Sequence, residues 1–230
     1  MFKSVIGKNK TNLVLLHGWG TTWESLYPLL ALLKPQFNLY APNLPYPTGH
    51  ALTLDDYCQF VADLIKTNKI TKPVLIGHSL GGAICTRLCV THPHLASKII
   101  LLSAATVRHE LPPHLKFFQK FSKVLHPFRK SILKLLRLDA SDYIVLKTEA
   151  EKQTFRNLIQ LDQTPTLSQI STPTLILWGD HDLSTPLSDG QQIHSLIKRS
   201  KFKSFPNTGH FFYLDHSAEV AKLISNFALS

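Results

Sequence analysis

Apolar residues along this chain fall into two patterns, which predict strands and helices in alternation. Six runs, most of them rich in leucine and β-branched residues, are too short for helices and are bounded by turn-forming residues. We predict strands at residues 12–16, 37–41, 74–76, 98–102, 174–178 and 201–205. Most of these runs are apolar throughout, which is typical of strands buried on both faces of a parallel sheet.

Between the strands, apolar positions recur every three or four residues, as on one face of a helix. The clearest case begins at Thr53, where Asp55 and Asp56 occupy the first turn and suit the positive end of the helix dipole. A last helix carries Val220 and Ile224 on one face. The sequence therefore predicts an α/β fold, with a mostly parallel sheet of six or seven strands and helices on both faces.

Gly77-His78-Ser79-Leu80-Gly81 follows the third predicted strand and leads into a helix. A serine at such a sharp turn is held in a strained conformation, so the residues two before and two after it must be small. Gly77 and Gly81 meet that demand, and Ser79 becomes a candidate nucleophile at a helix N-terminus. The alternative is a serine that only caps the following helix.

His17-Gly18-Trp19-Gly20 ends the first predicted strand. Its glycines allow a tight turn, and placed beside Ser79 the loop would offer the backbone N–H of Trp19 to pair with that of Leu80. Two such donors would form an oxyanion hole. The alternative is a plain turn between a strand and a helix, and His17 is expected to hold this loop in place.

Candidates for the acid and the base follow the last two predicted strands. Asp180 and Asp182 both lie where open α/β sheets build their sites, at the carboxyl end of a strand. Asp180 is readily explained as a turn former, whereas Asp182 reaches further into the loop and is preferred. His210, after Gly209, completes the chain order Ser, Asp, His.

The alternation of strands and helices stops between residues 106 and 170, where we predict a helical cap over the site. We divide the chain into a core domain, 1–105 and 171–230, and this insertion, which includes a helix from Thr148 to Leu161. The underside of the cap is predicted to carry Phe117, Phe118 and Phe121, and its basic face Lys116, Lys120, Lys123, Lys130, Lys134 and Arg137. The alternative is an ordinary solvated basic face.

Charge is the bulk property that changes this picture, because the 230 residues carry a formal net charge of +10. This charge suits an acidic protein or an anionic surface, and no nucleic-acid partner is predicted because no recognition motif is present. No run reaches the roughly 18 apolar residues of a membrane span, and residues 1–10 lack the core of a secretory signal. We therefore expect a cytoplasmic protein without membrane insertion. Cys58, Cys85 and Cys89 have no metal-binding spacing.

These motifs resemble those of the α/β-hydrolase family over nearly the whole chain. The resemblance rests on His17-Gly18-Trp19-Gly20, Gly77-His78-Ser79-Leu80-Gly81-Gly82, Gly179-Asp180-His181-Asp182 and Gly209-His210. It implies a triad of Ser79, Asp182 and His210, oxyanion donors at Trp19 and Leu80, and a helical cap. The haloalkane dehalogenases and epoxide hydrolases of this family need an aspartate at the turn that carries the nucleophile, the nucleophile elbow. This chain has Ser79 there, so these branches are excluded. The family commonly has two or more strands before the oxyanion-loop strand, so this chain implies a trimmed sheet.

The predicted activity is that of a serine hydrolase, which cleaves a carboxylic ester through an acyl-enzyme without a metal or organic cofactor. Within the family the chain resembles the branch of the pimeloyl-acyl-carrier-protein methyl ester esterases and small carboxylesterases. An acidic acyl carrier protein would suit the basic cap as a partner. A generic short-chain carboxylesterase, a thioesterase or a carbon–carbon hydrolase would use the same residues. A small-molecule receptor without turnover is the alternative from another class, and we expect a monomer.

Overall fold

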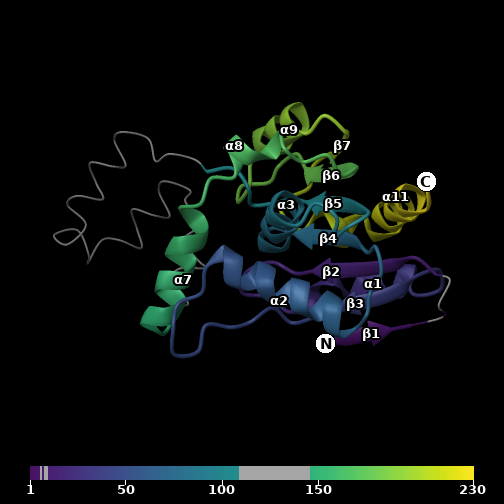
Figure 1. Ribbon diagram of the computed structural model, residues 1–230. Coiled ribbons are helices and arrows are strands. Elements are labelled where there is room, and N and C mark those ends of the chain that lie inside the picture. The colour runs from purple at the N-terminus through teal and green to yellow at the C-terminus, as the bar shows by residue number, and fades with distance from the viewer. Residues whose placement is uncertain (6, 8–9, 109–145) are drawn as a thin grey trace.

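The computed structural model describes residues 1–5, 7, 10–108 and 146–230, which form a seven-stranded sheet covered by helices (Figure 1). The strands are β1 (Phe2–Ser4), β2 (Asn12–Leu16), β3 (Asn38–Ala41), β4 (Val74–His78), β5 (Lys98–Leu102), β6 (Thr174–Gly179) and β7 (Ser200–Phe205). Their order across the sheet is β1-β3-β2-β4-β5-β6-β7. Within the described sheet β1 runs antiparallel to β3, and the other neighbouring pairs are parallel. The predicted fold class and strand number are confirmed.

Helices cover both faces of the sheet. They are a 3-10 turn (Trp23–Leu26), α1 (Tyr27–Leu33), α2 (Leu54–Thr67), α3 (Leu80–Thr91), α7 (Glu149–Ile159), α8 (Thr164–Leu167), α9 (Leu187–Leu196), α10 (Phe212–Asp215) and α11 (Ser217–Leu229). α1, α10 and α11 share one apolar core, and α2, α3, α8 and α9 share the other. Each helix in the described part of the chain is too short or too polar to cross a bilayer.

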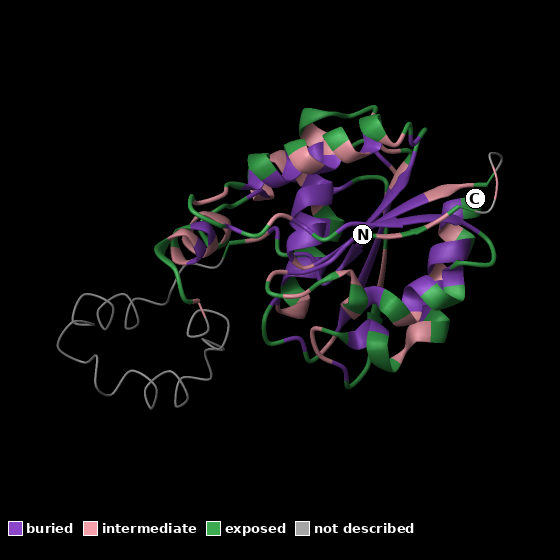
Figure 2. Cartoon of the chain, turned by 90° about the horizontal axis from the view of Figure 1, so that it is seen from below, coloured by how far each residue is buried: buried purple, intermediate pink, exposed green. Residues whose placement is uncertain are grey.

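Side chains of each central strand alternate between the two cores. Leu13 and Leu15 of β2 pack with α1 and α11, whereas Val14 and Leu16 pack with α2 and α3. All four side chains are fully buried, and Figure 2 shows burial continuing from the strands into the facing sides of the helices. Successive side chains of a strand point to opposite faces, so a strand between two cores must be apolar at every position.

Two local features differ from the sequence-based expectation. β1 was not among the predicted strands, because three residues at a sheet edge are too few to show a periodic pattern. The run Thr21-Thr22-Trp23-Glu24 after β2 predicts a capped helix start, and the hydroxyl of Thr22 does accept the backbone N–H of Glu24. The first turn is instead a 3-10 turn, and the α-helix starts at Tyr27, next to Pro28. A proline is tolerated in the first helical turn because the N–H that it lacks would have no partner there.

The N-terminus of α3 is in backbone contact with two strands. A Cβ atom at Gly77 of β4 would overlap the carbonyl group of Gly81, and a Cβ at Gly81 would overlap the carbonyl of Leu16 at the end of β2. Glycine is therefore required at both positions for the helix to start this close to the sheet.

We predict that Gly77→Ala lowers the thermal unfolding midpoint by about 5–10 °C. Forced overpacking costs about 1–3 kcal/mol or more, and each kcal/mol shifts the midpoint by roughly 2–4 °C in a chain of this size. Gly7→Ala is the matched control, because no atom lies within 4 Å of a Cβ at that position. Circular dichroism measures both midpoints, and equal midpoints for the two variants would contradict the close contact.

Candidate active site

The carboxyl ends of β2 and β4 lie side by side, and the chain leaves them toward opposite faces of the sheet. α1, which follows β2, packs in one core, and α3, which follows β4, packs in the other. A crevice opens at such a point, and open α/β sheets bind their ligands there. The loops that carry the predicted oxyanion donors and the predicted nucleophile meet at this point.

Ser79 occupies the turn between β4 and α3 with φ 51° and ψ −113°. Such a conformation costs a non-glycine residue about 1–3 kcal/mol and persists only where its surroundings enforce it. Its N–H donates to the carbonyl of Leu102 in β5 at 3.0 Å, and its carbonyl accepts the N–H groups of Ala83 at 3.1 Å and Ala105 at 3.0 Å. Within the described residues its side chain makes no capping bond to α3. The turn is therefore not explained as a simple helix cap.

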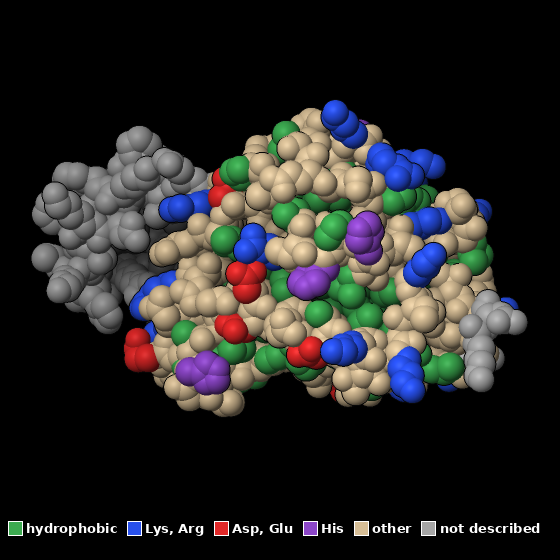
Figure 3. Space-filling view, viewed as in Figure 1, with side chains coloured by type: hydrophobic (Ala, Val, Ile, Leu, Met, Phe, Trp, Pro, Cys, Tyr) green, Lys and Arg blue, Asp and Glu red, His purple; other side chains and the backbone are tan. Residues whose placement is uncertain are grey.

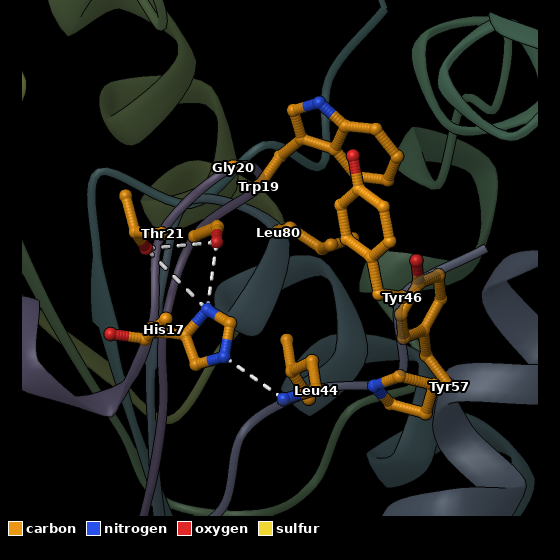
Figure 4. A pocket seen from close by; sticks show the side chains of 11 residues that line it. His17, Trp19, Gly20, Thr21, Leu44, Tyr46, Tyr57 and Leu80 are labelled. Atoms are coloured by element: carbon orange, nitrogen blue, oxygen red, sulfur yellow. Dashed lines mark hydrogen bonds between the residues drawn. The ribbon is translucent and has the colours of Figure 1, made fainter. Parts of the chain in front are cut away.

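His17 ties the loop after β2 to the proline-rich loop after β3. Its Nδ1 lies 2.8 Å from the carbonyl oxygen of Gly18, and its Nε2 lies 2.9 Å from the backbone N–H of Leu44 (Figure 4). Burial lowers the pKa of His17, so the ring is neutral, with Nδ1–H donating and Nε2 accepting. This bridge fixes the loop that carries Trp19.

Trp19 and Leu80, the two predicted oxyanion donors, line one pocket. Leu80 is the first residue of α3, so its N–H has no carbonyl partner within the helix and contributes to the positive end of the helix dipole. A Cβ at Gly18 would lie 3.3 Å from Cβ of Ser79. The loop after β2 therefore reaches Ser79 because Gly18 has no side chain.

Asp182 and His210, from the loops after β6 and β7, contact each other directly. Nδ1 of His210 lies 2.8 Å from Oδ2 of Asp182. The Asp182 side chain is fully buried, and 15% of the His210 side chain is exposed. With Nδ1–H donating to the carboxylate, Nε2 of His210 is left free of a proton and can accept one. Asp180, the other acid considered from the sequence, lies at the end of β6, where its N–H donates to the carbonyl of Phe205 at 3.1 Å.

The Asp182 carboxylate accepts three further hydrogen bonds. The backbone N–H groups of Ser184 and Thr185 donate to Oδ1, and the Thr185 hydroxyl donates to Oδ2, each at 2.9 Å. Burial raises the pKa of Asp182, but the bond and the charge interaction with His210, together with the bond from the Thr185 backbone N–H, lower it further than burial raises it. Asp182 is therefore held ionised and in one orientation.

The pocket beside the elbow has a volume of about 180 Å³ (Figure 4). Its lining residues are His17, Gly18, Trp19, Gly20, Thr21, Thr22, Leu44, Pro45, Tyr46, Tyr57 and Leu80. At about 30 Å³ per water molecule in the liquid, this space suits a group of about six heavy atoms. The sequence motifs assigned no role in the site to Tyr46 or Tyr57, since one lies in a proline-rich loop and the other belongs to the apolar pattern of α2.

α7 is attached to the wall of this pocket. The Tyr46 hydroxyl donates to Oε1 of Glu151 at 2.7 Å, and the Leu52 N–H donates to Oγ1 of Thr154 at 2.8 Å. The rings of Trp19 and Phe155 lie 5.8 Å apart between centroids. α7 confirms the helix predicted after Thr148, and these contacts place it next to the loops that line the pocket.

The other side chains predicted for the cap lie outside the described residues. They are Phe117, Phe118, Phe121, Lys116, Lys120, Lys123, Lys130, Lys134 and Arg137. On the described surface, basic residues also occupy the opposite end of the sheet, where residues 34–37, 68–73 and 196–199 contain Lys and Arg but no Asp or Glu. Figure 3 shows Lys and Arg side chains, without Asp or Glu, on the side of the molecule away from α7. Part of the net charge therefore lies far from the pocket.

We predict that Thr185→Val destabilises the protein at pH 7 by about 1.5 kcal/mol, because it removes one hydrogen bond to an ionised group. The difference should shrink as the pH falls through the lowered pKa of Asp182. A carboxyl whose pKa is lowered in the folded state contributes stability above its unfolded pKa, and loses that contribution on protonation. Unfolding midpoints from pH 7 to about pH 2 measure this, with Thr185→Ser as the control that keeps the hydroxyl. A difference in stability between Thr185→Val and the wild type that stays constant with pH would contradict a bond from Thr185 to an ionised Asp182.

Comparison with known proteins gives the family. Residues 13–223 match the model of a family described as the alpha/beta hydrolase family. An uncharacterized hydrolase of Bacillus subtilis is 23% identical over 247 residues, which cover 95% of this chain and 90% of the relative. A pimeloyl-acyl-carrier-protein methyl ester esterase of Wigglesworthia glossinidia brevipalpis is 23% identical over 256 residues, which cover 98% of this chain and 96% of the relative.

Solved structures agree on the fold. An esterase from Exiguobacterium antarcticum superposes with a TM-score of 0.76 at 20% identity, covering 100% of this chain and 94% of that one. At this identity the likeness speaks for the fold, while the family match spans most of the sequence. The chain therefore belongs to the alpha/beta hydrolase family.

Proposed function

We propose that the protein is a serine hydrolase that cleaves carboxylic esters, with Ser79 as nucleophile, His210 as general base and Asp182 as the acid of the triad. One observation carries the proposal. A buried carboxylate holds the Nδ1 side of His210 at 2.8 Å, at the same end of the sheet where Ser79 is kept at a positive φ. A catalytic triad is recognised by the geometry and the roles of its groups. The contact between Asp182 and His210 and the strained turn at Ser79 support one here.

The mechanism follows from the protonation states. Nε2 of His210 takes the hydroxyl proton of Ser79 as the oxygen attacks the ester carbonyl, and the proton then passes to the leaving alcohol. Asp182 stays ionised, fixes the tautomer of His210 and stabilises the imidazolium. Water, activated by His210, then hydrolyses the acyl-enzyme. The proposal calls on no metal ion or organic cofactor.

The N–H groups of Trp19 and Leu80 are proposed to bind the oxyanion. Both residues line the pocket next to Ser79, and the Leu80 N–H lies at the positive end of α3. Loss of one oxyanion donor costs about 3–4 kcal/mol of transition-state stabilisation in comparable sites. The fixed position of Trp19 supports this role, because His17 ties its loop to Leu44.

Residues 106–170 are proposed to form the cap insertion, of which the part before α8 closes the substrate site, whereas α8 itself packs in the core with α3 and α9. The contacts of α7 with Tyr46, Leu52 and Trp19 support a cap on this side of the sheet. Phe117, Phe118 and Phe121 would extend the apolar lining that Trp19, Leu44 and Tyr57 provide. An acyl or alcohol group of about six heavy atoms would fit the described part of the pocket.

The proposed physiological substrate is the methyl ester of a pimeloyl group on an acyl carrier protein. Support comes from relatives that carry this activity in their names and from the net charge of +10, which suits an acidic carrier. A short-chain carboxylesterase or thioesterase would use the same catalytic groups, and the experiments below separate these substrates.

We predict hydrolysis of p-nitrophenyl esters in a series from acetate to decanoate, in which the chain length of the best substrate measures the size of the acyl pocket. Ser79→Ala should reduce turnover by at least 10³-fold, since it removes the nucleophile. Its unfolding midpoint should stay close to that of the wild type. A folded wild type that is inactive on every p-nitrophenyl ester would point to a receptor without turnover or to a partner-bound substrate, and inactivity on the carrier-bound methyl ester as well would overturn the proposal.

We also predict that charge reversal of Lys120, Lys123 and Lys134 slows hydrolysis of the carrier-bound ester and leaves a small ester unaffected. The reason is electrostatic steering, so the loss should appear in kcat/KM and fade at high salt. Charge reversal of Lys34, Lys72 and Lys198, at the opposite end of the sheet, is the matched control. Equal losses on both substrates would exclude a carrier-protein site on the cap.

A further inference from the structure

His78 is a buried histidine between the proposed nucleophile and the proposed base. It is the last residue of β4, directly before Ser79, and 1% of it is exposed. Its ring centroid lies 4.7 Å from that of His210 and 5.0 Å from those of Phe211 and Tyr213. The imidazole is therefore enclosed by the loop that carries the base.

One hydrogen bond joins this ring to the backbone of the base. Nε2 of His78 lies 3.1 Å from the carbonyl oxygen of His210. A carbonyl only accepts, so Nε2 must carry the proton. Burial, followed by the proximity of His210, lowers the pKa of His78 to about 3. A neutral ring has one proton, and Nδ1 is therefore bare, consistent with its having no partner within the described structure.

The bond adds a tie in a new direction to a loop that other contacts already hold. The side chain of His210 is bound at Nδ1 by Asp182, and the loop is joined to the β6 side by the bond from the His181 N–H to the Thr208 carbonyl at 2.9 Å. Both contacts hold His210 to the loop after β6. The bond from His78 ties it to β4, the strand that positions Ser79.

We propose that His78 is a positioning residue, whose Nε2–H bond to the carbonyl of His210 sets the distance between the nucleophile strand and the general base. The catalytic part of this inference rests on the proposed function. Loss of the bond would let the loop after β7 shift relative to β4. A misplacement of about 1 Å in an active site can lower the rate about 100-fold. The competing explanation is that the ring only fills space in the core.

Two substitutions separate positioning from packing. His78→Phe keeps a planar ring in the same space and removes the donor, whereas His78→Gln supplies an amide N–H that can reach the carbonyl. Ile99→Val serves as a control, because it shortens a fully buried side chain near the start of β5, whereas His78 lies at the end of β4. Unfolding midpoints show whether the variants are folded.

The kinetic arm measures kcat and KM on p-nitrophenyl acetate. We expect His78→Phe to lower kcat by about 10–100-fold with KM changed less than about twofold, and His78→Gln to recover most of the loss. Ile99→Val should keep the kcat of the wild type. A kcat that follows the unfolding midpoint across all three variants, without recovery by glutamine, would overturn the proposal.

A second arm does not depend on turnover. Nitrogen-15 NMR of the imidazole rings should show His78 neutral with its proton on Nε2 from pH 5 to 9, and His78→Phe should shift the ring signals of His210. A proton on Nδ1, or unchanged His210 signals in the phenylalanine variant, would overturn the inference even if esters are hydrolysed. A wild type without turnover would remove the catalytic part and the proposed function, and the NMR result would still decide whether His78 positions His210.

Discussion

The backbone contact between β4, α3 and β2 is the constraint on which the rest of the site depends. It exists because Gly77 and Gly81 carry no Cβ atom that would overlap the facing carbonyl groups. Only with the helix this close can the chain turn through one residue, and that residue, Ser79, absorbs the strain in its positive φ. Bonds to β5 and α3 stabilise the strained turn. The proposed nucleophile is therefore oriented by the packing of the sheet.

The remaining groups are held by hydrogen bonds between loops. His17 links the loops after β2 and β3, Asp182 links those after β6 and β7, and His78 links β4 to the loop after β7. His17 and His78 are buried, and burial lowers the pKa of both. Each neutral ring donates from one nitrogen, Nδ1 in His17 and Nε2 in His78. Sequential loops at one end of a parallel sheet are separate segments. These bonds join the loops after β2 and β3 to each other, and β4 to the loops after β6 and β7.

The sequence was informative where function demands a local pattern. The glycine spacing around Ser79 and the apolar strands were readable because each reflects contacts within a few residues. The preference for Asp182 over Asp180 agrees with the contact to His210, while the catalytic roles of these residues remain proposals. Two hydrogen bonds could not be predicted from the sequence: that from Thr185 to Asp182, and that from His78 to a carbonyl 132 residues away. Both depend on how the loops fold against one another. β1 was missed because its pairing with β3 fixes three residues without a pattern of their own.

The pocket and the proposed proton acceptor are built by different parts of the chain. Residues that line the pocket come from the loops after β2 and β3, from α2 and from the start of α3. Asp182 and His210 belong to the loops after β6 and β7, and β7 pairs with one neighbour, β6, within the described sheet. In the proposed function, ligand recognition and proton transfer are thus separable properties of this architecture. A change confined to the last two strands would leave a chain that still recognises its ligand and no longer consumes it, which is a short structural path from a hydrolase to a receptor.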